Sequence, residues 1–269
     1  MPEPEPIWQS EASVPANSRG LAYGDGLFET ILVCRGRPWL LDAHIERLAL
    51  GAARLDLNLN VDHVVELVEA ALEHAGEREW CVLKLVATRV PSARGYAYTD
   101  SASELMISVH AADAWPEQVP AVATRVAQTR LAVQPVLAGI KHLNRLEQVI
   151  ARAEHPSADY PELILLDADG WVTEGVSANL FAVIDDQLCT PVLDRCGVAG
   201  VVRSIVMSTR NVAERRFRTR DLLGASEVFL TNSLRGVWRV ASVSHDGVTH
   251  DFSGSEITAQ VRETLMASL

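Results

Sequence analysis

The pattern of hydrophobic and polar residues changes its period several times along the first 112 residues of this chain. Runs of apolar and β-branched residues predict strands, and apolar residues three and four positions apart predict amphipathic helices. By these criteria strands are predicted at 27–34, 80–90 and 104–110, and helices at 42–55 and 61–74. Asp42 is placed to cap the first helix, which carries Ile45, Leu48 and Ala49 on one face.

The second half of the chain continues this mixture. Helices are predicted to start near 144, 198 and 255, and strands at 122–128, 162–167, 171–174, 178–184, 187–190, 212–217, 227–231 and 237–243. The sequence Asn144-Arg-Leu-Glu147 resembles a capping box. The helix that follows carries an apolar stripe of Leu146, Val149, Ile150 and Ala153.

The segment 113–120 interrupts these patterns with prolines and is the best candidate for a linker. Strands and helices are interleaved on both sides of it without a regular strand–helix–strand repeat, which favours an α+β fold over a doubly wound sheet. We therefore expect a smaller N-terminal domain over 1–112 and a larger C-terminal domain over 121–269, which would carry Lys141.

The composition restricts the possible functions. A chain of 269 residues that is 48% hydrophobic and 22% charged is globular and long enough for one large or two ordinary domains. A net charge of −11 argues against binding to nucleic acid, and no apolar run approaches the roughly 20 residues that span a membrane. The four cysteines form no CxxC pair and no HExxH motif is present, so we expect no metal site, reduced thiols and a cytoplasmic location.

Only two of the 24 lysine and arginine residues are lysines, Lys84 and Lys141. A lysine amine can lose its proton and form a Schiff base, whereas a guanidinium stays charged. Lys141 precedes a predicted helix in a loop with glycine, where it could attach a cofactor aldehyde; a leftover surface lysine is the alternative. Lys84 lies in a predicted strand, and we expect its head to reach solvent.

Other charged residues have two interpretations each. Glu174, at the end of a predicted strand, is either an exposed turn residue or a carboxylate beside a pyridine nitrogen, which would keep that nitrogen protonated. Arg47 alone is typical of a solvated helix face. The segment 200–203 opens a helix, and such a helix start together with an arginine would suit a phosphate group.

Five motifs in order resemble those of the class IV pyridoxal phosphate (PLP) enzymes, which include branched-chain and D-amino-acid aminotransferases and aminodeoxychorismate lyase. They are Tyr-Gly-Asp-Gly-Leu-Phe-Glu-Thr at 23–30, His-Ile-Glu-Arg at 44–47, Lys-His-Leu-Asn-Arg at 141–145, Val-Thr-Glu-Gly at 172–175 with Asn-Leu-Phe at 179–181, and Gly-Val-Val-Arg at 200–203. The resemblance extends from about residue 17 to the C-terminus, and residues 138–149 look most like the lyase branch.

The resemblance implies the two-domain class IV fold and PLP as cofactor, and it gives roles to particular residues. Lys141 would hold the cofactor covalently, and Glu174 would pair with its pyridine nitrogen. The cofactor phosphate would be bound by Arg47, the Val201 and Val202 backbone N–H groups and Ser233. Many relatives have threonine where this chain has Val202, so one hydroxyl contact is missing.

Substrate-side roles are implied for four residues. Thr30 matches a lyase position near the reacting centre, and Asn232 falls where the lyases carry a substrate-side residue. Tyr96 is either a substrate-side residue or an ordinary loop residue. Arg94 aligns with an arginine that binds a substrate carboxylate in some relatives; its other interpretation is an ordinary loop arginine, and Arg145 is equally open.

The resemblance implies conversion of 4-amino-4-deoxychorismate to pyruvate and 4-aminobenzoate, a folate precursor, with Lys141 moving the proton. The alternative is an aminotransferase for D- or branched-chain amino acids that uses the same cofactor residues. A non-enzymatic PLP-carrying protein is less compatible with the presence of both Lys141 and Glu174. A homodimer is implied by the family alone.

Overall fold

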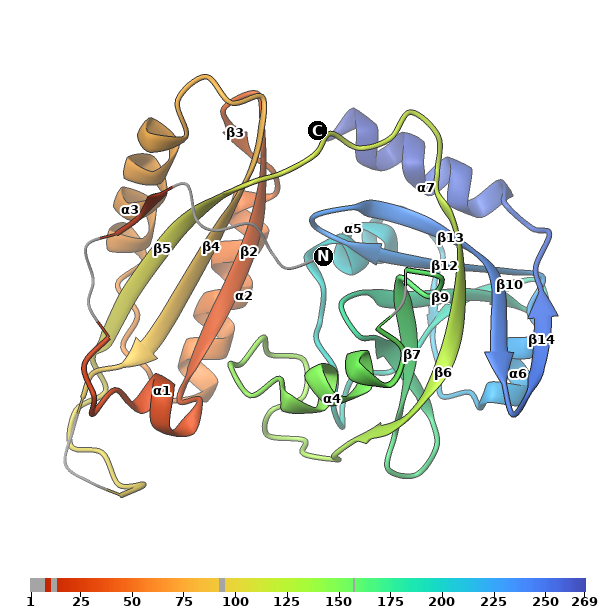
Figure 1. Cartoon of the computed structure of the whole chain (residues 1–269), viewed down its shortest axis with the longest axis horizontal. Helices are drawn as coiled ribbons and strands as arrows, with labels where there is room; N and C mark the ends of the chain where they lie inside the picture. The colour runs from red at the N-terminus through yellow and green to blue at the C-terminus, as the bar shows by residue number, and fades with distance from the viewer. Residues whose placement is uncertain (1–7, 11–13, 92–94, 157) are drawn as a thin grey trace. The chain divides into compact units, whose positions relative to one another are not determined.

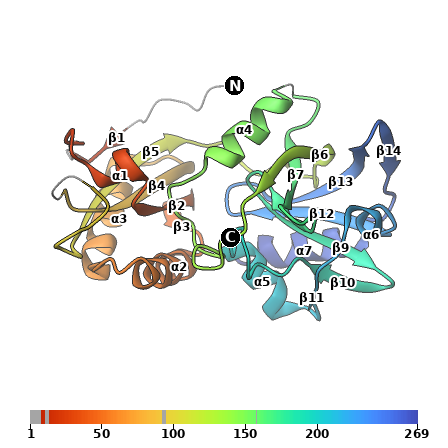
Figure 2. The same cartoon turned by 90° about the horizontal axis from the view of Figure 1, so that it is seen from below.

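The structure, a computed structural model, describes residues 8–10, 14–91, 95–156 and 158–269 (Figures 1 and 2). The chain divides into two compact units. Unit 1 comprises Met1–Ala114 together with Ile140–Asn144, and unit 2 comprises Trp115–Gly139 and Arg145–Leu269. The division after Ala114 falls within the expected linker 113–120. Among the described residues, no helix is both long enough and apolar enough to span a membrane.

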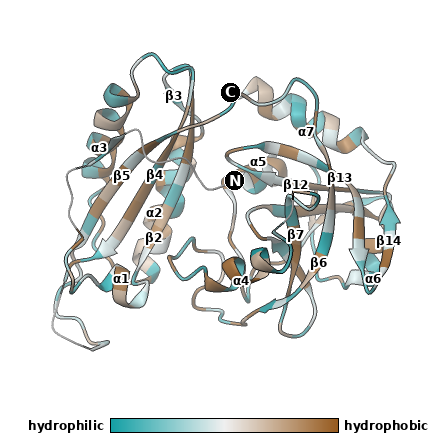
Figure 3. Ribbon diagram, in the orientation of Figure 1, coloured by the Kyte–Doolittle hydropathy of each residue, from teal (hydrophilic) through white to brown (hydrophobic). Residues whose placement is uncertain are grey.

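Unit 1 is built around a five-stranded antiparallel sheet with the order β1-β5-β4-β2-β3. Its elements are β1 (Trp8–Gln9), α1 (Arg19–Tyr23), β2 (Gly26–Cys34), β3 (Arg37–Pro38), α2 (Leu41–Arg54), α3 (Val61–Ala75), β4 (Trp80–Arg89) and β5 (Ser103–Ala111). Helix α2 packs against β2, and α3 packs against β5 and β4. Hydrophobic residues lie along the strands, as Figure 3 shows.

Helix α2 differs from its prediction in a way that matters for the site. Asp42 is not its cap: Leu40 occupies the N-cap position with φ 58° and no side-chain hydrogen bond, and Asp42 lies in the first turn. On the predicted apolar face, Leu48 is buried and Ile45 and Ala49 are half-buried. The other fully buried residues of the helix are His44, Gly51 and Ala52. The histidine is buried because the sheet offers it a charged partner, as described below.

The segment Ile140–Asn144 belongs to unit 1, whereas we expected Lys141 in the C-terminal domain. The reason is backbone pairing along the open edge of β2. Phe28 N–H donates to the Lys141 carbonyl at 3.0 Å, and Leu143 N–H donates to the Gly26 carbonyl at 3.0 Å. The chain therefore returns from unit 2 to extend the sheet of unit 1 by a short strand-like segment.

Unit 2 contains a mixed nine-stranded sheet with the order β11-β10-β9-β12-β13-β6-β7-β8, and β14 pairs with β13. Its elements are β6 (Ala121–Leu131), α4 (Leu146–Glu154), β7 (Glu162–Asp167), β8 (Val172–Gly175), β9 (Asn179–Ile184), β10 (Gln187–Thr190), α5 (Val201–Thr209), β11 (Ala213–Glu214), α6 (Thr219–Leu223), β12 (Glu227–Asn232), β13 (Gly236–His245), β14 (Val248–Asp251) and α7 (Glu256–Ala267). Strand β6 runs parallel to both β13 and β7.

The predicted start of α5 near residue 198 is three residues early, because α5 begins at Val201. Residues 197–199 instead form an isolated parallel bridge with Gly139: Gly139 N–H donates to the Gly197 carbonyl at 2.9 Å, and Ala199 N–H donates to the Gly139 carbonyl at 2.9 Å. This bridge uses the backbone groups that an earlier helix start would need.

Helix α4 turns its predicted apolar stripe outward. Leu146, Val149 and Ile150 are 70%, 62% and 50% exposed, while Gln148 and Ala151 are buried. The expected capping box does not form, since Arg145 is the N-cap and makes no side-chain cap hydrogen bond. Periodicity identified the helix correctly but not the face that packs on the sheet.

Candidate active site

Lys141 lies beside Phe28 at the edge of the unit 1 sheet. The bridge between Leu27 and His142 is antiparallel, so Phe28 and Lys141 are cross-strand neighbours. The Lys141 Nζ atom is 4.2 Å from the centroid of the Phe28 ring. The segment 140–144, at the edge of the sheet, thus places Lys141 beside the ring of Phe28.

Thr30 and Glu29 point to opposite faces of β2. Side chains two residues apart in a strand share a face, so half-buried Thr30 lies on the face of Phe28, next to which Lys141 sits. Glu29, which is 1% exposed, lies on the other face, toward α2. The predicted catalytic pair of Lys141 and Thr30 therefore shares one face of unit 1.

Glu29 receives two basic side chains from α2. Arg47 Nε donates to Glu29 Oε1 at 2.8 Å and Arg47 Nη2 donates to Oε2 at 2.5 Å, a bidentate pair. His44 Nδ1 lies 2.6 Å from the same Oε2. Burial alone would raise the pKa of Glu29, but the charge of Arg47 and the hydrogen bonds from both partners lower it to about 2. Glu29 is therefore ionised at neutral pH.

An ionised carboxylate only accepts hydrogen bonds, so His44 Nδ1 must carry a hydrogen and donate it. Burial lowers the pKa of His44, and the charges of Arg47 and Lys141 lower it further against the opposing effect of Glu29. The ring is thus neutral, with Nε2 as an acceptor. This Nε2 atom is buried and has no hydrogen-bond partner within the part of the chain that the structure describes.

In unit 2, Glu174 on β8 is a buried carboxylate rather than an exposed turn residue, since it is 4% exposed. Its Oε2 accepts the Val198 backbone N–H at 2.8 Å. The neighbouring Gly197 has φ +85°, and a Cβ there would lie 3.0 Å from Thr173 Cγ2 and 3.3 Å from Glu174 Oε2. Glycine at this position keeps the loop against the carboxylate.

The start of α5 follows this loop directly. Its N-cap, Gly200, makes no side-chain hydrogen bond to the first turn, which begins with the buried residues Val201 and Val202. A Cβ on Gly200 would fall 1.9 Å from Asn179 Oδ1, and Asn179 Nδ2 donates to the Val198 carbonyl at 2.8 Å. Asn179 thus holds the loop in place, and an uncapped helix start of this kind favours an anion.

Asn232 and Ser233 lie at the turn between β12 and β13. The Asn232 Oδ1 atom accepts the N–H groups of Leu234 and Arg235 at 3.0 and 2.8 Å, and its Nδ2 donates to the Ser177 carbonyl at 3.2 Å. These bonds give Asn232 a structural task that the sequence did not indicate. It shapes the turn that carries Ser233.

Arg94 and Tyr96 are the remaining residues that were predicted to contact substrate. Arg94 lies outside the described residues. Tyr96 is 85% exposed, its ring lies 5.4 Å from that of Tyr23, and its carbonyl accepts a hydrogen bond from the Arg19 guanidinium at 2.9 Å. The Arg19 guanidinium of α1 thus anchors the backbone at Tyr96.

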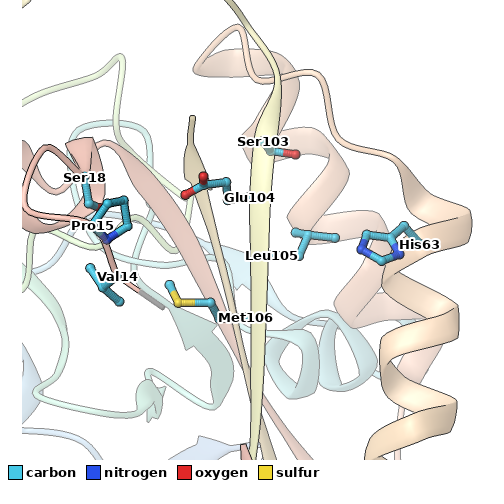
Figure 4. Close-up of a pocket in the computed structure, with 8 residues that line it drawn as sticks. All are labelled: Val14, Pro15, Ser18, His63, Ser103, Glu104, Leu105 and Met106. Carbon is cyan, nitrogen blue, oxygen red and sulfur yellow. The ribbon is translucent and has the colours of Figure 1, made fainter. Parts of the chain in front are cut away.

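Unit 1 also has a pocket of about 300 Å³, shown in Figure 4. It is lined by Val14, Pro15, Ser18, His63, Ser103, Glu104, Leu105 and Met106. None of the predicted site residues lines it, so it is separate from the candidate site. No group of three or more metal-ligating side chains occurs within residues 8–10, 14–91, 95–156 and 158–269.

Sequence reasoning missed Glu29, His44 and Asn179 as supporting residues. All three lie within motifs that were recognised, yet only their neighbours were given roles. A possible signal for Glu29 was a charged residue within an otherwise apolar strand, since such a residue needs a buried partner.

A sequence profile of the family described as amino-transferase class IV matches residues 26–243 of the chain. The chain therefore belongs to the class IV amino-transferase family. The family and the α+β class IV fold predicted from the sequence are both confirmed by this match and by the structural likeness reported next.

The relatives include lyases and aminotransferases. The chain is 33% identical over 266 residues to the aminodeoxychorismate lyase of Vibrio harveyi, covering 95% of this chain and 96% of the relative. It is 29% identical over 266 residues to a putative branched-chain-amino-acid aminotransferase of Methanocaldococcus jannaschii, covering 95% and 91%. The crystal structure of 4-amino-4-deoxychorismate lyase from Pseudomonas aeruginosa matches with a TM-score of 0.87 and 38% identity, over 97% of this chain and 98% of that one.

Proposed function

We propose that this protein is a PLP-dependent lyase that converts 4-amino-4-deoxychorismate to 4-aminobenzoate and pyruvate in folate biosynthesis. The observation that carries this proposal is the likeness to two lyases, at 33% and 38% identity, over almost the full length of each chain. The aminotransferase relative is less similar, at 29% identity. The position of Lys141 beside Phe28, on the strand face of Thr30, supports the same function.

Each unit holds residues whose chemistry suits a part of PLP. Glu174 offers a buried carboxylate for the pyridine nitrogen, and the uncapped first turn of α5 offers the N–H groups of Val201 and Val202 to the phosphate. From unit 1, Lys141 would attach the cofactor, and Arg47 would add charge to the phosphate site. Ser233, in the turn shaped by Asn232, is proposed as the hydroxyl donor to the phosphate.

When bound, PLP would supply an electron-withdrawing ring that stabilises negative charge on the carbon bearing the substrate nitrogen. The amine of Lys141, when it is not bound to the cofactor, would take the proton from that carbon. The electron pair of the broken C–H bond completes the aromatic ring of 4-aminobenzoate as the bond to the enolpyruvyl oxygen breaks. A positioned general base of this kind contributes about 10²–10⁴-fold to the rate.

Thr30 would hold the proton that the departing enolpyruvyl group needs at its methylene carbon to become pyruvate. Its side chain shares a strand face with Phe28, whose ring Lys141 contacts, and on this ground we propose that a proton taken by the lysine passes by way of Thr30. A Thr30→Val variant should then turn over more slowly with little change in cofactor binding.

For the two substrate carboxylates we propose Arg94 as the main partner, with Tyr96 and Asn232 on the substrate side and Arg145 as a further candidate. A few local arginines can bind a dianion although the protein carries a net charge of −11. An Arg94→Ala variant should raise KM more than it lowers kcat, because the contact would be similar in the ground state and the transition state.

We further propose a homodimer that acts in the cytoplasm. Exposed Leu146, Val149 and Ile150 form an apolar face on α4, which would be expected to be covered in an assembly. The four cysteines are free, as in proteins of reducing compartments. Light scattering of wild type and of a Val149→Glu variant tests the dimer: the variant should be monomeric if α4 forms the interface.

The decisive experiment incubates the PLP-loaded protein with 4-amino-4-deoxychorismate and no keto acid, and measures pyruvate and 4-aminobenzoate together. Equal amounts of both over many turnovers support the lyase. Lys141→Ala should abolish turnover, while Lys84→Ala, which changes the only other lysine, should not. If an amino acid instead converts the cofactor to its pyridoxamine form and neither product appears, the protein is an aminotransferase.

A further inference from the structure

The Glu29 carboxylate is a buried group to which the proposed reaction gives no task. It is 1% exposed, and both of its oxygens accept hydrogen bonds from α2. Arg47 uses Nε and Nη2, one edge of its guanidinium, to make this bidentate pair. Because a bidentate pair fixes the plane of the guanidinium as well as its distance, the carboxylate determines where the rest of the Arg47 head group points.

We propose that Glu29 is a positioning residue that orients Arg47 for the cofactor phosphate, with His44 holding the carboxylate from its other side. This inference rests on the proposed function in one respect, the assignment of Arg47 to the phosphate. His44 contributes because its Nδ1 lies 2.6 Å from the same Oε2 atom that accepts from Arg47 Nη2, which prevents the carboxylate from rotating away.

The pattern of donors requires a carboxylate and not an amide. Oε1 faces Arg47 Nε–H, and Oε2 faces both Arg47 Nη2–H and His44 Nδ1–H. A glutamine at this position has one acceptor oxygen and one NH₂ group. Whichever way the amide lies, its NH₂ group faces an N–H of Arg47, so the guanidinium must turn or move.

Glu29 also has a second effect, which weakens phosphate binding where its orientation of Arg47 strengthens it. Its negative charge offsets that of Arg47 and weakens the attraction of the site for a phosphate dianion. Removing the charge could therefore strengthen phosphate binding if orientation were unimportant. An aspartate variant separates the two effects, because it keeps the charge but withdraws the carboxylate by one methylene from Arg47 and His44.

The test compares the binding of PLP and of pyridoxal, which lacks the phosphate, to the full chain after removal of its cofactor. Dissociation constants from absorbance titration give the preference for the phosphate as their ratio. We expect Glu29→Gln and Glu29→Asp both to reduce this preference by roughly ten-fold or more, the effect of losing one charge-assisted hydrogen bond. Pyridoxal affinity should stay near that of wild type, which also shows that the variants are folded.

The other outcomes overturn the inference in distinguishable ways. A preference that is unchanged or increased in Glu29→Asp, which keeps the charge, would show that orientation by Glu29 does not matter. Equal weakening of PLP and pyridoxal would show a merely structural role. An Arg47→Gln variant is measured in parallel: if it leaves the preference unchanged, Arg47 does not bind the phosphate, and that part of the proposed function fails as well.

Discussion

Two buried glutamates, one in each unit, illustrate opposite ways to keep a carboxylate out of water. Glu29 and Glu162 are each 1% exposed. Glu29 accepts from Arg47 and His44, and its pKa falls to about 2. Glu162 accepts from neutral donors, including the Ser177 hydroxyl at 2.5 Å and the Ser177 N–H at 3.1 Å. Burial raises the pKa of Glu162 in spite of these bonds.

The difference lies in what each carboxylate holds. Glu29 joins two side chains of one helix and is stabilised in its charged form by a cation. Glu162 joins β7 to the turn between β8 and β9, and it accepts hydrogen bonds from the backbone N–H and the hydroxyl of Ser177 in that turn. Strand β8 carries Glu174, and β9 begins at Asn179. Losing a hydrogen-bond partner should therefore reduce the free energy of unfolding strongly at Glu29 and moderately at Glu162. A change of pH should shift the contributions of the two glutamates to stability in opposite directions.

The largest effect is expected from Arg47→Met. It leaves the Glu29 charge buried with only His44 beside it, and breaking a buried ion pair on one side costs about 3–5 kcal/mol. Urea denaturation of the cofactor-free protein at pH 7 measures this loss. Arg37→Met, at an exposed arginine on β3, is the matched control and should change stability by less than about 0.5 kcal/mol. A loss below about 1 kcal/mol for Arg47→Met would mean that Glu29 is protonated or rehydrated in the variant.

The next effect is the response of Glu29 to acid. Its folded pKa, about 2, lies below its ordinary value of 4.5, so its contribution to stability is present above pH 4.5 and is lost as pH falls toward 2. The stability advantage of wild type over Glu29→Gln should therefore shrink on acidification, by about 3 kcal/mol over the whole window. Denaturation curves at pH 6, 5, 4 and 3 are sufficient to measure the slope.

Glu162 provides the contrast for this measurement. Its pKa is raised by burial, so its contribution is greatest below the ordinary value and is lost as pH rises through the folded pKa. Wild type compared with Glu162→Gln should thus gain stability on acidification, where wild type compared with Glu29→Gln loses it. If the stability difference between wild type and variant changed with pH in the same direction for Glu29→Gln and Glu162→Gln, the distinction between the two sites would be wrong.

A smaller effect is expected at neutral pH from Glu162→Ala. The Ser177 hydroxyl and N–H and the Leu163 N–H would lose their acceptor in a buried place, which costs about 1–3 kcal/mol. Glu162→Gln should cost less, because the amide oxygen can still accept from the turn. If alanine and glutamine were equally destabilising, the charge and not the hydrogen bonding of Glu162 would hold the turn.

The sequence was sufficient to identify candidate site residues and the elements that carry them, but not the residues that pack around them. Lys141 was identified because lysine is rare here, and the strand that contains Glu29 was predicted from its apolar run. The pairing of His44 with Glu29 could not be predicted, because it depends on which face of α2 meets the sheet. The same limitation explains why the apolar stripe of α4 was identified while its exposure was not: periodicity gives a face but not what covers it.

The placement of Lys141 in unit 1 was missed for a related reason. Its segment joins the sheet through backbone hydrogen bonds to Gly26 and Phe28, and such bonds carry no side-chain signature. Domain boundaries inferred from linkers also assume that a unit is continuous in sequence. The start of α5 was misplaced because the bridge between Gly139 and residues 197–199 is likewise a backbone contact between distant segments.

The smallest effect, and the finest test of the comparison, is expected from Ser177→Ala. It removes one hydrogen bond to Glu162 but leaves the Ser177 N–H to the same carboxylate and the Ser177 carbonyl to Asn232, so about 1 kcal/mol should be lost at neutral pH. Ser226→Ala, at an exposed hydroxyl with a 3.4 Å contact, is the control and should change stability by less than about 0.5 kcal/mol.

The pH dependence of that loss decides what the hydroxyl does. The Ser177 bond favours the ionised form of Glu162 and lowers its pKa, so removing the bond raises that pKa further. The loss should then be largest above the folded pKa of Glu162 and shrink on acidification, because a protonated carboxyl group gains less from a donated hydrogen bond. A loss independent of pH would mean that the hydroxyl stabilises the neutral acid and the carboxylate of Glu162 equally well.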